Sequence, residues 1–196
     1  MMMRSGFGVL FLLVIPAGAE NLLPNGSFDD VSEPLSGWNT DYAWSRNTWY
    51  ADNRERVEVV QNEQGRNRVA KLTSGSDQGS KLESNPIPFD PGARYRCTLD
   101  VKGGEYRIYF AGYKWKPRVQ PQDPPALASL RPVYKSKQMT GKSGSWKQVT
   151  LEIPAKNLSP QARQHVEQIK FITVYVWMMR TGYIDNVTVT RTPADR

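Results

Sequence analysis

The chain has 196 residues, of which 39% are hydrophobic and 11% aromatic, and its 26 Lys and Arg outnumber 19 Asp and Glu to give a net charge of +7. This composition excludes a disordered chain and is typical of one globular domain with a sizeable core. A single cysteine, Cys97, excludes an internal disulfide, and a single histidine, His165, leaves too few ligands for a zinc site of the usual His/Cys type.

Residues 1–19 have the layout of a secretory signal peptide, with Arg4 before an apolar run and Ala17-Gly18-Ala19 as a cleavage site. The apolar run is too short for a membrane span, which takes roughly 20 residues. We therefore expect an exported protein, secreted, periplasmic or on the cell surface, with a mature domain over 20–196. The alternative is a membrane anchor that is not removed.

Short alternating runs separated by turn residues predict an all-β chain. The predicted strands cover residues 56–61, 68–74, 80–89, 94–102, 105–115, 133–139, 146–153, 169–177 and 182–190. Strands of this length and spacing favour a two-sheet sandwich.

Two segments interrupt this strand pattern. Residues 116–132 include five prolines, which predicts a long loop because proline cannot donate to a central strand. Residues 159–168 are predicted to form one short helix, with Ser159 as N-cap and Pro160 at the first helical position. His165 lies on this helix and is expected to be solvated, whereas Cys97 alternates with apolar residues and is expected to be a buried, inert thiol.

Both ends of the mature chain match one known family. The segment "NLLPNGSFDD" (21–30), the segment "GYIDNVTVT" (182–190), the Pro-Gly turn before Tyr95 and the strand led by Trp146 resemble the jelly-roll carbohydrate-binding modules of the 4/9/16/22 type. These modules are galactose-binding-like β-sandwiches, so the resemblance implies a two-sheet antiparallel jelly-roll sandwich. The resemblance implies that the N-terminal segment packs beside the last strand and that sugar binds a groove on the concave sheet.

The resemblance also implies a metal site. Family members often hold a structural calcium near the two ends of the domain, and Asp29 and Asp185 occupy the matching positions. Calcium takes six to eight oxygen ligands, which carboxylates, carbonyls and water supply together. The alternative is that both acids only accept hydrogen bonds from turn amides.

Strand parity selects the residues that would bind sugar, because rings stack on sugar C–H faces while polar groups hold hydroxyls. In 105–115 and 169–177 the aliphatic faces should enter the core. The opposite faces carry the candidate binding residues Arg107, Tyr109, Tyr113, Trp115, Tyr175 and Trp177. The resemblance implies that Trp38, Tyr95, Trp146 and Tyr183 lie in the core. An early loop with Trp44, Trp49 and Tyr50 is a weaker candidate for a groove wall.

An enzyme is the minority interpretation. Glycoside hydrolysis needs two carboxylates facing one groove, and the candidate faces carry aromatics and arginine, with Asp100 and Glu105 as the nearest acids. Tyr109, Tyr113 and Arg107 leave a polysaccharide lyase as a lesser alternative.

We therefore predict an exported, non-catalytic polysaccharide-binding module. Removal of residues 1–19 leaves a charge of +6, which favours an anionic polysaccharide as partner but equally serves solubility. No block of five cations occurs, which argues against nucleic acid. A structural or adhesive module of the cell envelope is the alternative from another class.

Overall fold

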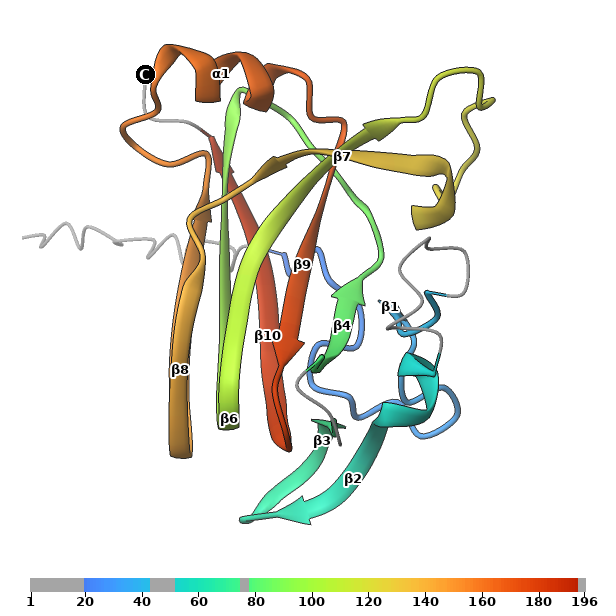
Figure 1. Ribbon diagram of the computed structural model, residues 1–196, viewed down its shortest axis with the longest axis vertical. Coiled ribbons are helices and arrows are strands. Elements are labelled where there is room, and N and C mark those ends of the chain that lie inside the picture. The colour runs from blue at the N-terminus through green and yellow to red at the C-terminus, as the bar shows by residue number, and fades with distance from the viewer. Residues whose placement is uncertain (1–19, 43–51, 75–77, 194–196) are drawn as a thin grey trace, which may run out of the picture.

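The computed structural model describes residues 20–42, 52–74 and 78–193, and most of them lie in strands of one curled antiparallel sheet (Figure 1). The predicted signal peptide and the aromatic loop with Trp44, Trp49 and Tyr50 lie outside the described residues. The strands are β1 (Trp38–Asn39), β2 (Val57–Glu63), β3 (Arg66–Leu72), β4 (Ser80–Ser84), β5 (Ile87–Pro88), β6 (Ala93–Trp115), β7 (Leu130–Lys135), β8 (Met139–Ile153), β9 (Phe171–Met178) and β10 (Gly182–Pro193). The helical segments are η2 (Asn53–Arg56), η3 (Leu127–Ser129) and α1 (Pro160–Glu167).

The 23-residue strand β6 runs through both layers of the fold and joins them. Before its Gly103-Gly104 pair the odd-numbered Tyr95 and Leu99 are buried, and after it the even-numbered Ile108 and Phe110 are buried. All four belong to one core cluster, so β6 folds over at the glycine pair. Gly103 has a φ of +118°, and a Cβ there would lie 2.4 Å from the Cα of Gly182, so only glycine fits this corner.

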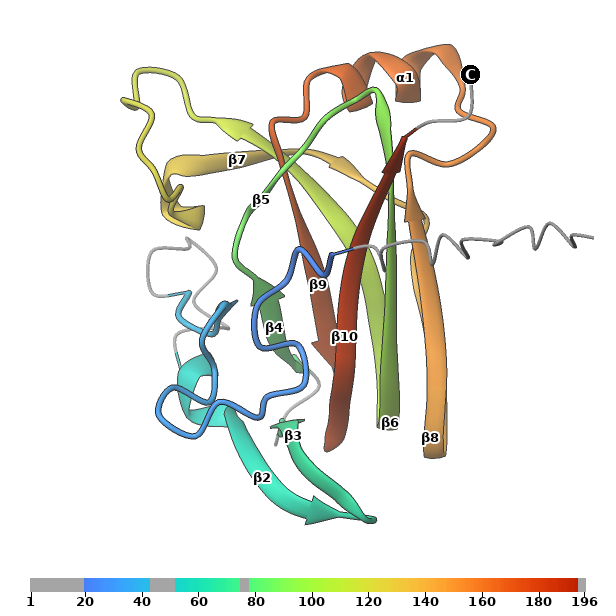
Figure 2. The same cartoon turned by 180° about the vertical axis from the view of Figure 1, so that it is seen from behind.

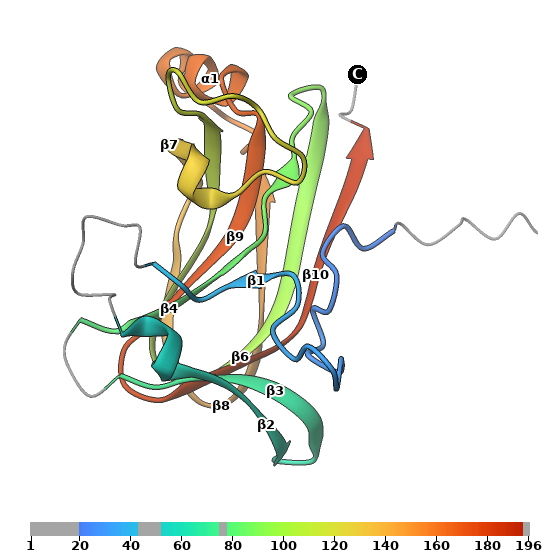
Figure 3. The same cartoon turned by 90° about the vertical axis from the view of Figure 1, so that its right-hand side faces the viewer.

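The neighbouring strands are divided between the two halves of β6. β10 pairs with its first half and β9 with its second half, while β8 pairs with both. The first layer therefore contains β2, β3, β10 and the first half of β6, and the second layer contains β1, β4, β7, β9 and the second half of β6. Figure 3 shows these layers from the side, with β10 and β9 on different sides of the core. The predicted all-β sandwich with one helix is confirmed.

The N-terminal segment lies along β10, as Figure 2 shows from behind. Leu22 donates its backbone N–H to the Val189 carbonyl at 2.7 Å, and Val187 donates to the Gly26 carbonyl at 2.8 Å. The predicted contact between the two ends of the domain is confirmed. Gly26 is required here because a Cβ on it would lie 1.9 Å from the Val187 carbonyl oxygen.

Three sequence predictions about strand boundaries need correction. The ranges 94–102 and 105–115 form one strand, because glycines let the chain turn the corner without losing its pairing. The range 80–89 instead divides into β4 and β5 on either side of Asn85-Pro86. β8 begins at Met139, seven residues before the predicted range 146–153, because it pairs with β6 on both sides of the corner.

Trp146 and Tyr183 are not core residues, contrary to the prediction. Both are half-buried on the outer face of the first layer, where their rings lie 6.5 Å apart. The register between β10 and β6 shifts between Asp185 and Thr188, and Asn186 has a φ of +50°. This bulge changes the strand parity, so Ile184 and Val187 both face the core while Tyr183 points outward.

Other predictions are confirmed. Helix α1 begins as expected, with the Ser159 hydroxyl accepting from the Ala162 N–H at 3.2 Å. His165 is exposed on this helix, Cys97 is fully buried, and burial raises the pKa of its thiol. Among the residues that the structure describes, no helix is both long and apolar enough to cross a bilayer.

Phe28 anchors the N-terminal segment and provides a test of the fold. Its ring is 0% exposed and stacks on Trp38 with 5.3 Å between centroids. We expect Phe28→Ala to lower the free energy of unfolding by about 3–5 kcal/mol, because the substitution removes a buried ring with its stacking contact and leaves a cavity. Urea unfolding followed by tryptophan fluorescence measures the change.

Val31 supplies the matched control, because it lies three residues further along and is 76% exposed. Val31→Ala should stay within about 0.5 kcal/mol of the parent. Equal losses for the two variants would show that Phe28 does not hold the segment in place.

Candidate functional site

The pairing of β6 with β9 gathers the predicted sugar-binding residues on one face. Arg107 lies opposite Trp177, Tyr109 opposite Tyr175, and Tyr113 opposite Phe171. The aliphatic partners along both strands, Ile108 and Val176 among them, point into the core. The outer side of the second layer, called the aromatic face below, therefore carries Arg107, Tyr109, Tyr113, Trp115, Phe171, Tyr175 and Trp177.

Ring contacts organise the middle of the aromatic face. Tyr109 and Tyr175 stack with 4.5 Å between centroids and 22° between planes. The Arg107 guanidinium lies 4.6 Å from the centroid of Trp177, and the Lys135 ammonium lies 4.6 Å from the centroid of Tyr109. Both distances are within the range of cation–π attraction. The face thus combines stacked rings with two cations held above ring surfaces.

The degree of exposure differs along the aromatic face. Arg107 is exposed, while Tyr109, Tyr113, Trp115 and Tyr175 are half-buried. Trp177 is only 8% exposed, and its indole N–H donates to the Gln78 carbonyl at 2.9 Å. Its neighbours therefore offer more ring surface than Trp177 itself does.

A buried carboxylate, Glu83, lies beneath the aromatic face and was missed by the sequence prediction. Its Oε1 accepts from the Tyr113 hydroxyl at 2.6 Å and from the Thr173 hydroxyl at 2.7 Å. Its Oε2 accepts from the Tyr42 hydroxyl at 3.3 Å. Three hydroxyl groups from separate parts of the chain thus converge on one acid that is 2% exposed.

The expectation that the nearest acids to this face are Asp100 and Glu105 was therefore wrong for Asp100 and missed Glu83, whereas Glu105 does line a hollow with Arg107. Asp100 and Glu105 both belong to β6, but Asp100 pairs with Arg66 in the first layer. Glu83 comes from β4, where it lies opposite Tyr175 of β9. The alternation of Lys81, Leu82 and Glu83 in "SKLES" was the available signal, since it leaves two charged residues on the side opposite a core leucine.

Burial shifts the pKa values of both Glu83 and Lys81 toward the uncharged forms. Burial raises the pKa of Glu83, and the hydroxyl donors Tyr113 and Thr173 with the Lys81 charge lower it in part. Burial lowers the pKa of Lys81 to about 8, against the opposing attraction of Glu83. The Lys81 ammonium lies 3.4 Å from the Tyr42 ring centroid, so an aromatic surface replaces part of its water.

Variants of Glu83 test whether this acid holds the aromatic face together. Glu83→Ala leaves three hydroxyls without their acceptor and should lower the free energy of unfolding by about 2–5 kcal/mol. Glu83→Gln keeps the shape and an acceptor while removing a carboxylate that burial disfavours in its charged form. At pH 7 we expect Glu83→Gln to be at least as stable as the parent.

The buried Glu83 carboxyl predicts that the stability of the protein depends on pH. Because the folded-state pKa of Glu83 is raised from its ordinary 4.5, the folded protein binds this proton more tightly than the unfolded chain does. The stability that this group contributes is fully present below pH 4.5 and is lost as the pH rises through the folded-state pKa. Urea midpoints of the parent minus those of Glu83→Gln should therefore fall as pH rises above 4.5. A rising difference would contradict the assignment.

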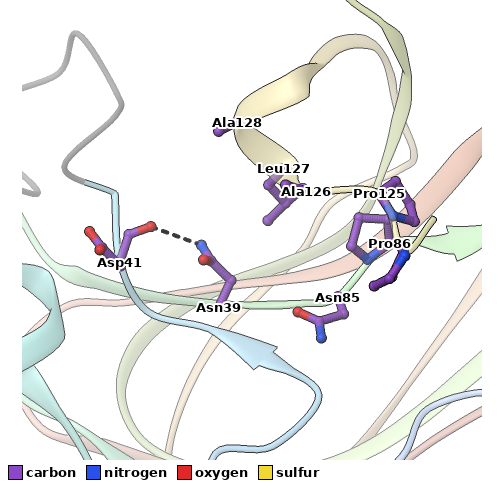
Figure 4. A pocket seen from close by; sticks show the side chains of 9 residues that line it. Asn39, Asp41, Asn85, Pro86, Pro125, Ala126, Leu127 and Ala128 are labelled. Atoms are coloured by element: carbon purple, nitrogen blue, oxygen red, sulfur yellow. Dashed lines mark hydrogen bonds between the residues drawn. The ribbon is translucent and has the colours of Figure 1, made fainter. Parts of the chain in front are cut away.

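A pocket of about 390 Å³ opens beside this network, between β1, the β4–β5 corner and the proline-rich segment (Figure 4). Asn39, which pairs with Glu83 in the sheet, and Asn85 lie on one side of it. Pro125 and Leu127 lie on the other side. The predicted loop 116–132 thus contributes a wall of this pocket, and its last residues form η3 and the start of β7.

The predicted calcium ligands Asp29 and Asp185 line one pocket together with two arginines, Arg66 and Arg68. Arg66 donates to Asp185 at 2.7 Å and to Asp100 at 2.9 Å. Asp29 instead accepts from the Asn67 amide at 2.8 Å. Among the described residues no group of three His, Cys, Asp or Glu side chains forms a metal cluster.

This arrangement fits a guanidinium better than it fits calcium. Arg66 already bridges Asp100 and Asp185, and its guanidinium lies 4.0 Å from the Trp146 ring centroid. A divalent cation would have to share the same carboxylates with this positive charge. The calcium site stays a prediction, and Arg66 is the cation that these contacts provide.

Removal of Arg66 tests the assignment. We expect Arg66→Met to lower the free energy of unfolding by about 1–3 kcal/mol, because Asp185 is largely buried and would lose its cation. Lys71→Met, which breaks an exposed pair with Glu58, should cost at most about 1 kcal/mol. Thermal unfolding of the parent should be the same in EDTA as in calcium. A lower melting temperature in EDTA would instead support the predicted calcium site.

Comparison with known proteins gives no family but gives a fold. No protein-family profile matches the chain, and no curated protein matches it. Among solved structures, the enzymatically active domain of tailspike protein 4 from bacteriophage CBA120 is 13% identical with a TM-score of 0.51, over 88% of this chain and 21% of that one. At this identity the likeness concerns the fold alone.

Carbohydrate-binding modules also occur among the similar structures. The tandem CBM22-1–CBM22-2 domain of Paenibacillus barcinonensis Xyn10C is 17% identical, with a TM-score of 0.49, over 81% of this chain and 47% of that one. The module TmCBM61, solved in complex with β-1,4-galactotriose, is 17% identical with a TM-score of 0.48, over 89% of this chain and 100% of that one.

Proposed function

We propose that this chain is an exported, non-catalytic polysaccharide-binding module whose ligand lies on the aromatic face. The observation that supports the proposal most is the stacked pair Tyr109–Tyr175, with cations above neighbouring rings. Rings present flat apolar surfaces to the C–H faces of sugars, and the charged and hydroxyl groups beside them bind sugar hydroxyls.

The network around Glu83 supports a role in positioning the site. A hydrogen bond to a buried carboxylate fixes the Tyr113 ring, and Thr173 holds the same carboxylate from β9. A ring that is fixed before the ligand arrives loses little conformational entropy on binding. Tyr113 thus contributes a preordered surface rather than a freely rotating one.

The chemistry of the face argues for binding without catalysis. Glycoside hydrolysis uses two carboxylates placed roughly 5–9.5 Å apart around the scissile bond. Of the acids near this face, Glu83 is already occupied by three hydroxyl donors, and Glu105 is exposed beside Arg107 at one end of it. A lyase built on Tyr113 would need that tyrosine to lose its proton, and burial and the adjacent Glu83 both raise its pKa.

A structural or adhesive module is the second candidate. The near-complete burial of Trp177 and the half-burial of the three tyrosines favour it, since a sugar platform needs accessible ring surface. The two candidates differ in whether the aromatic face binds polysaccharide.

Native affinity electrophoresis distinguishes them. The mature protein is run in gels that contain xylan, β-1,4-galactan, carboxymethyl dextran or dextran sulfate, beside Tyr175→Ala and Tyr183→Ala. Tyr175→Ala removes half of the stacked pair and should weaken binding at least about tenfold. Tyr183→Ala removes a half-buried tyrosine from the outer face of the first layer and should leave the affinity unchanged.

Two controls allow the electrophoresis result to be interpreted. Each variant is checked by urea unfolding, and Tyr109→Ala replaces Tyr175→Ala if the latter is not folded. Equal retardation of Tyr175→Ala and the parent would move the ligand site away from the aromatic face. No retardation of the folded parent in any gel would favour the structural module.

A further inference from the structure

The net excess of positive charge in residues 20–196 is confined to one segment. Residues 105–142 contain eight cations and two acids, a net charge of +6. The remaining residues from position 20 onward contain 17 cations and 17 acids. The whole excess therefore lies in 38 consecutive residues, although no block of adjacent cations reveals it in the sequence.

The fold places this charged segment on the layer that carries the aromatic face. Residues 105–142 comprise the second half of β6, the proline-rich loop, β7 and the first residues of β8. Of the cations of this segment, neither Arg107 nor Lys135 takes part in an ion pair with another described residue. By contrast, Arg66, Lys71 and Lys102, outside this segment, each pair with a carboxylate.

Two of these cations lie directly on the aromatic face. Arg107 and Lys135 are exposed, and each lies 4.6 Å from the centroid of a ring, Trp177 for one and Tyr109 for the other. Neither forms an ion pair with any described residue. Arg107 and Tyr109 are two residues apart on one strand face, about 6.6 Å along the strand.

We propose that the aromatic face binds an acidic polysaccharide, with Arg107 and Lys135 contacting its carboxylate or sulfate groups. The proposal rests on the proposed function and names its ligand class. Tyr109 and Tyr175 contact the sugar rings, while the two cations contact the negative groups that project from them. Arginine binds carboxylate and sulfate through two parallel N–H donors, and lysine acts as a point charge.

The surroundings of the two cations favour a negative ligand. Glu83, beneath this face, is buried and hydrogen-bonded and so offers no exposed charge to repel one, while the exposed acid beside Arg107 is Glu105. A hollow of about 340 Å³ at the Arg107 end has two cations and one acid in its lining, namely Arg107, Lys142 and Glu105. Both ends of the tyrosine pair thus have a cation within reach.

The test compares ligands that differ in charge but share a backbone. Dextran, carboxymethyl dextran and dextran sulfate are placed in native gels at 50 mM and 500 mM NaCl, with xylan and β-1,4-galactan as further neutral polymers. We expect retardation by at least one charged dextran, none by plain dextran, and weaker retardation at high salt because screening shortens electrostatic reach. The carboxymethyl and sulfate gels separate the two sources of negative charge.

Matched variants separate specific contacts from general charge attraction. Arg107→Gln and Lys135→Gln should each weaken the binding of the charged dextran about fivefold, the upper range for an exposed charge contact. Arg96→Gln and Lys147→Gln remove the same charge from exposed positions on the first layer and should leave the affinity unchanged. All four positions are exposed, so folding is expected to be unaffected.

Each outcome decides the proposal. Equal losses for all four variants, or retardation by xylan or galactan but by neither charged dextran, would overturn the acidic ligand and leave a neutral polysaccharide-binding module. No retardation in any gel would overturn the proposed function itself. Binding of oligo(dT) as tightly as the charged dextran, with the same loss in Arg107→Gln, would replace the polysaccharide with single-stranded nucleic acid.

Discussion

The fold-over of β6 at Gly103-Gly104 is the constraint on which the rest of the structure depends. It switches the strand parity, so the odd-numbered residues that fill the core in the first layer point outward in the second. Without that switch, Tyr109 and Tyr113 would enter the core and Ile108 and Phe110 would face solvent. The corner needs glycine because the chains of β6 and β10 approach too closely there for any side chain.

The aromatic face in turn depends on a buried acid. The Glu83 carboxylate accepts hydrogen bonds from the hydroxyl groups of Tyr42, Tyr113 and Thr173, and so links β4 with β6 and β9. Burying a carboxylate is unfavourable unless donors surround it, and here the donors are the residues that shape the face. The cost of burial thus specifies one arrangement of these side chains rather than adding to stability.

Two arginines show how the same residue type serves structure and recognition. Arg66 contacts a ring and two carboxylates, so its charge is neutralised within the domain and supports the join between the chain ends. Arg107 also contacts a ring but pairs with no described acid. A guanidinium that is already neutralised has little to offer a ligand, whereas one supported only by a ring keeps its charge available.

Local pattern alone determined much of this protein. Alternation predicted the strands, Ser159-Pro160 predicted the helix, and parity within 105–115 and 169–177 placed Arg107, Tyr109 and Tyr175 on outward faces. These features depend on residues close in sequence, because strand period and helix capping act over a few positions.

The tertiary structure decided the rest. Glu83 accepts a hydrogen bond from Thr173, which lies 90 residues further along the chain. The bulge in β10 places Tyr183 on the outer face rather than in the core, where it was predicted. Arg66, 119 residues from Asp185, donates to the carboxylate that the family resemblance proposes as a calcium ligand. The sequence alone contains the +6 segment, but only the folded sheet shows that two of its cations, Arg107 and Lys135, lie above rings. Such contacts join distant strands, and their partners are fixed by sheet pairing and burial rather than by any local period.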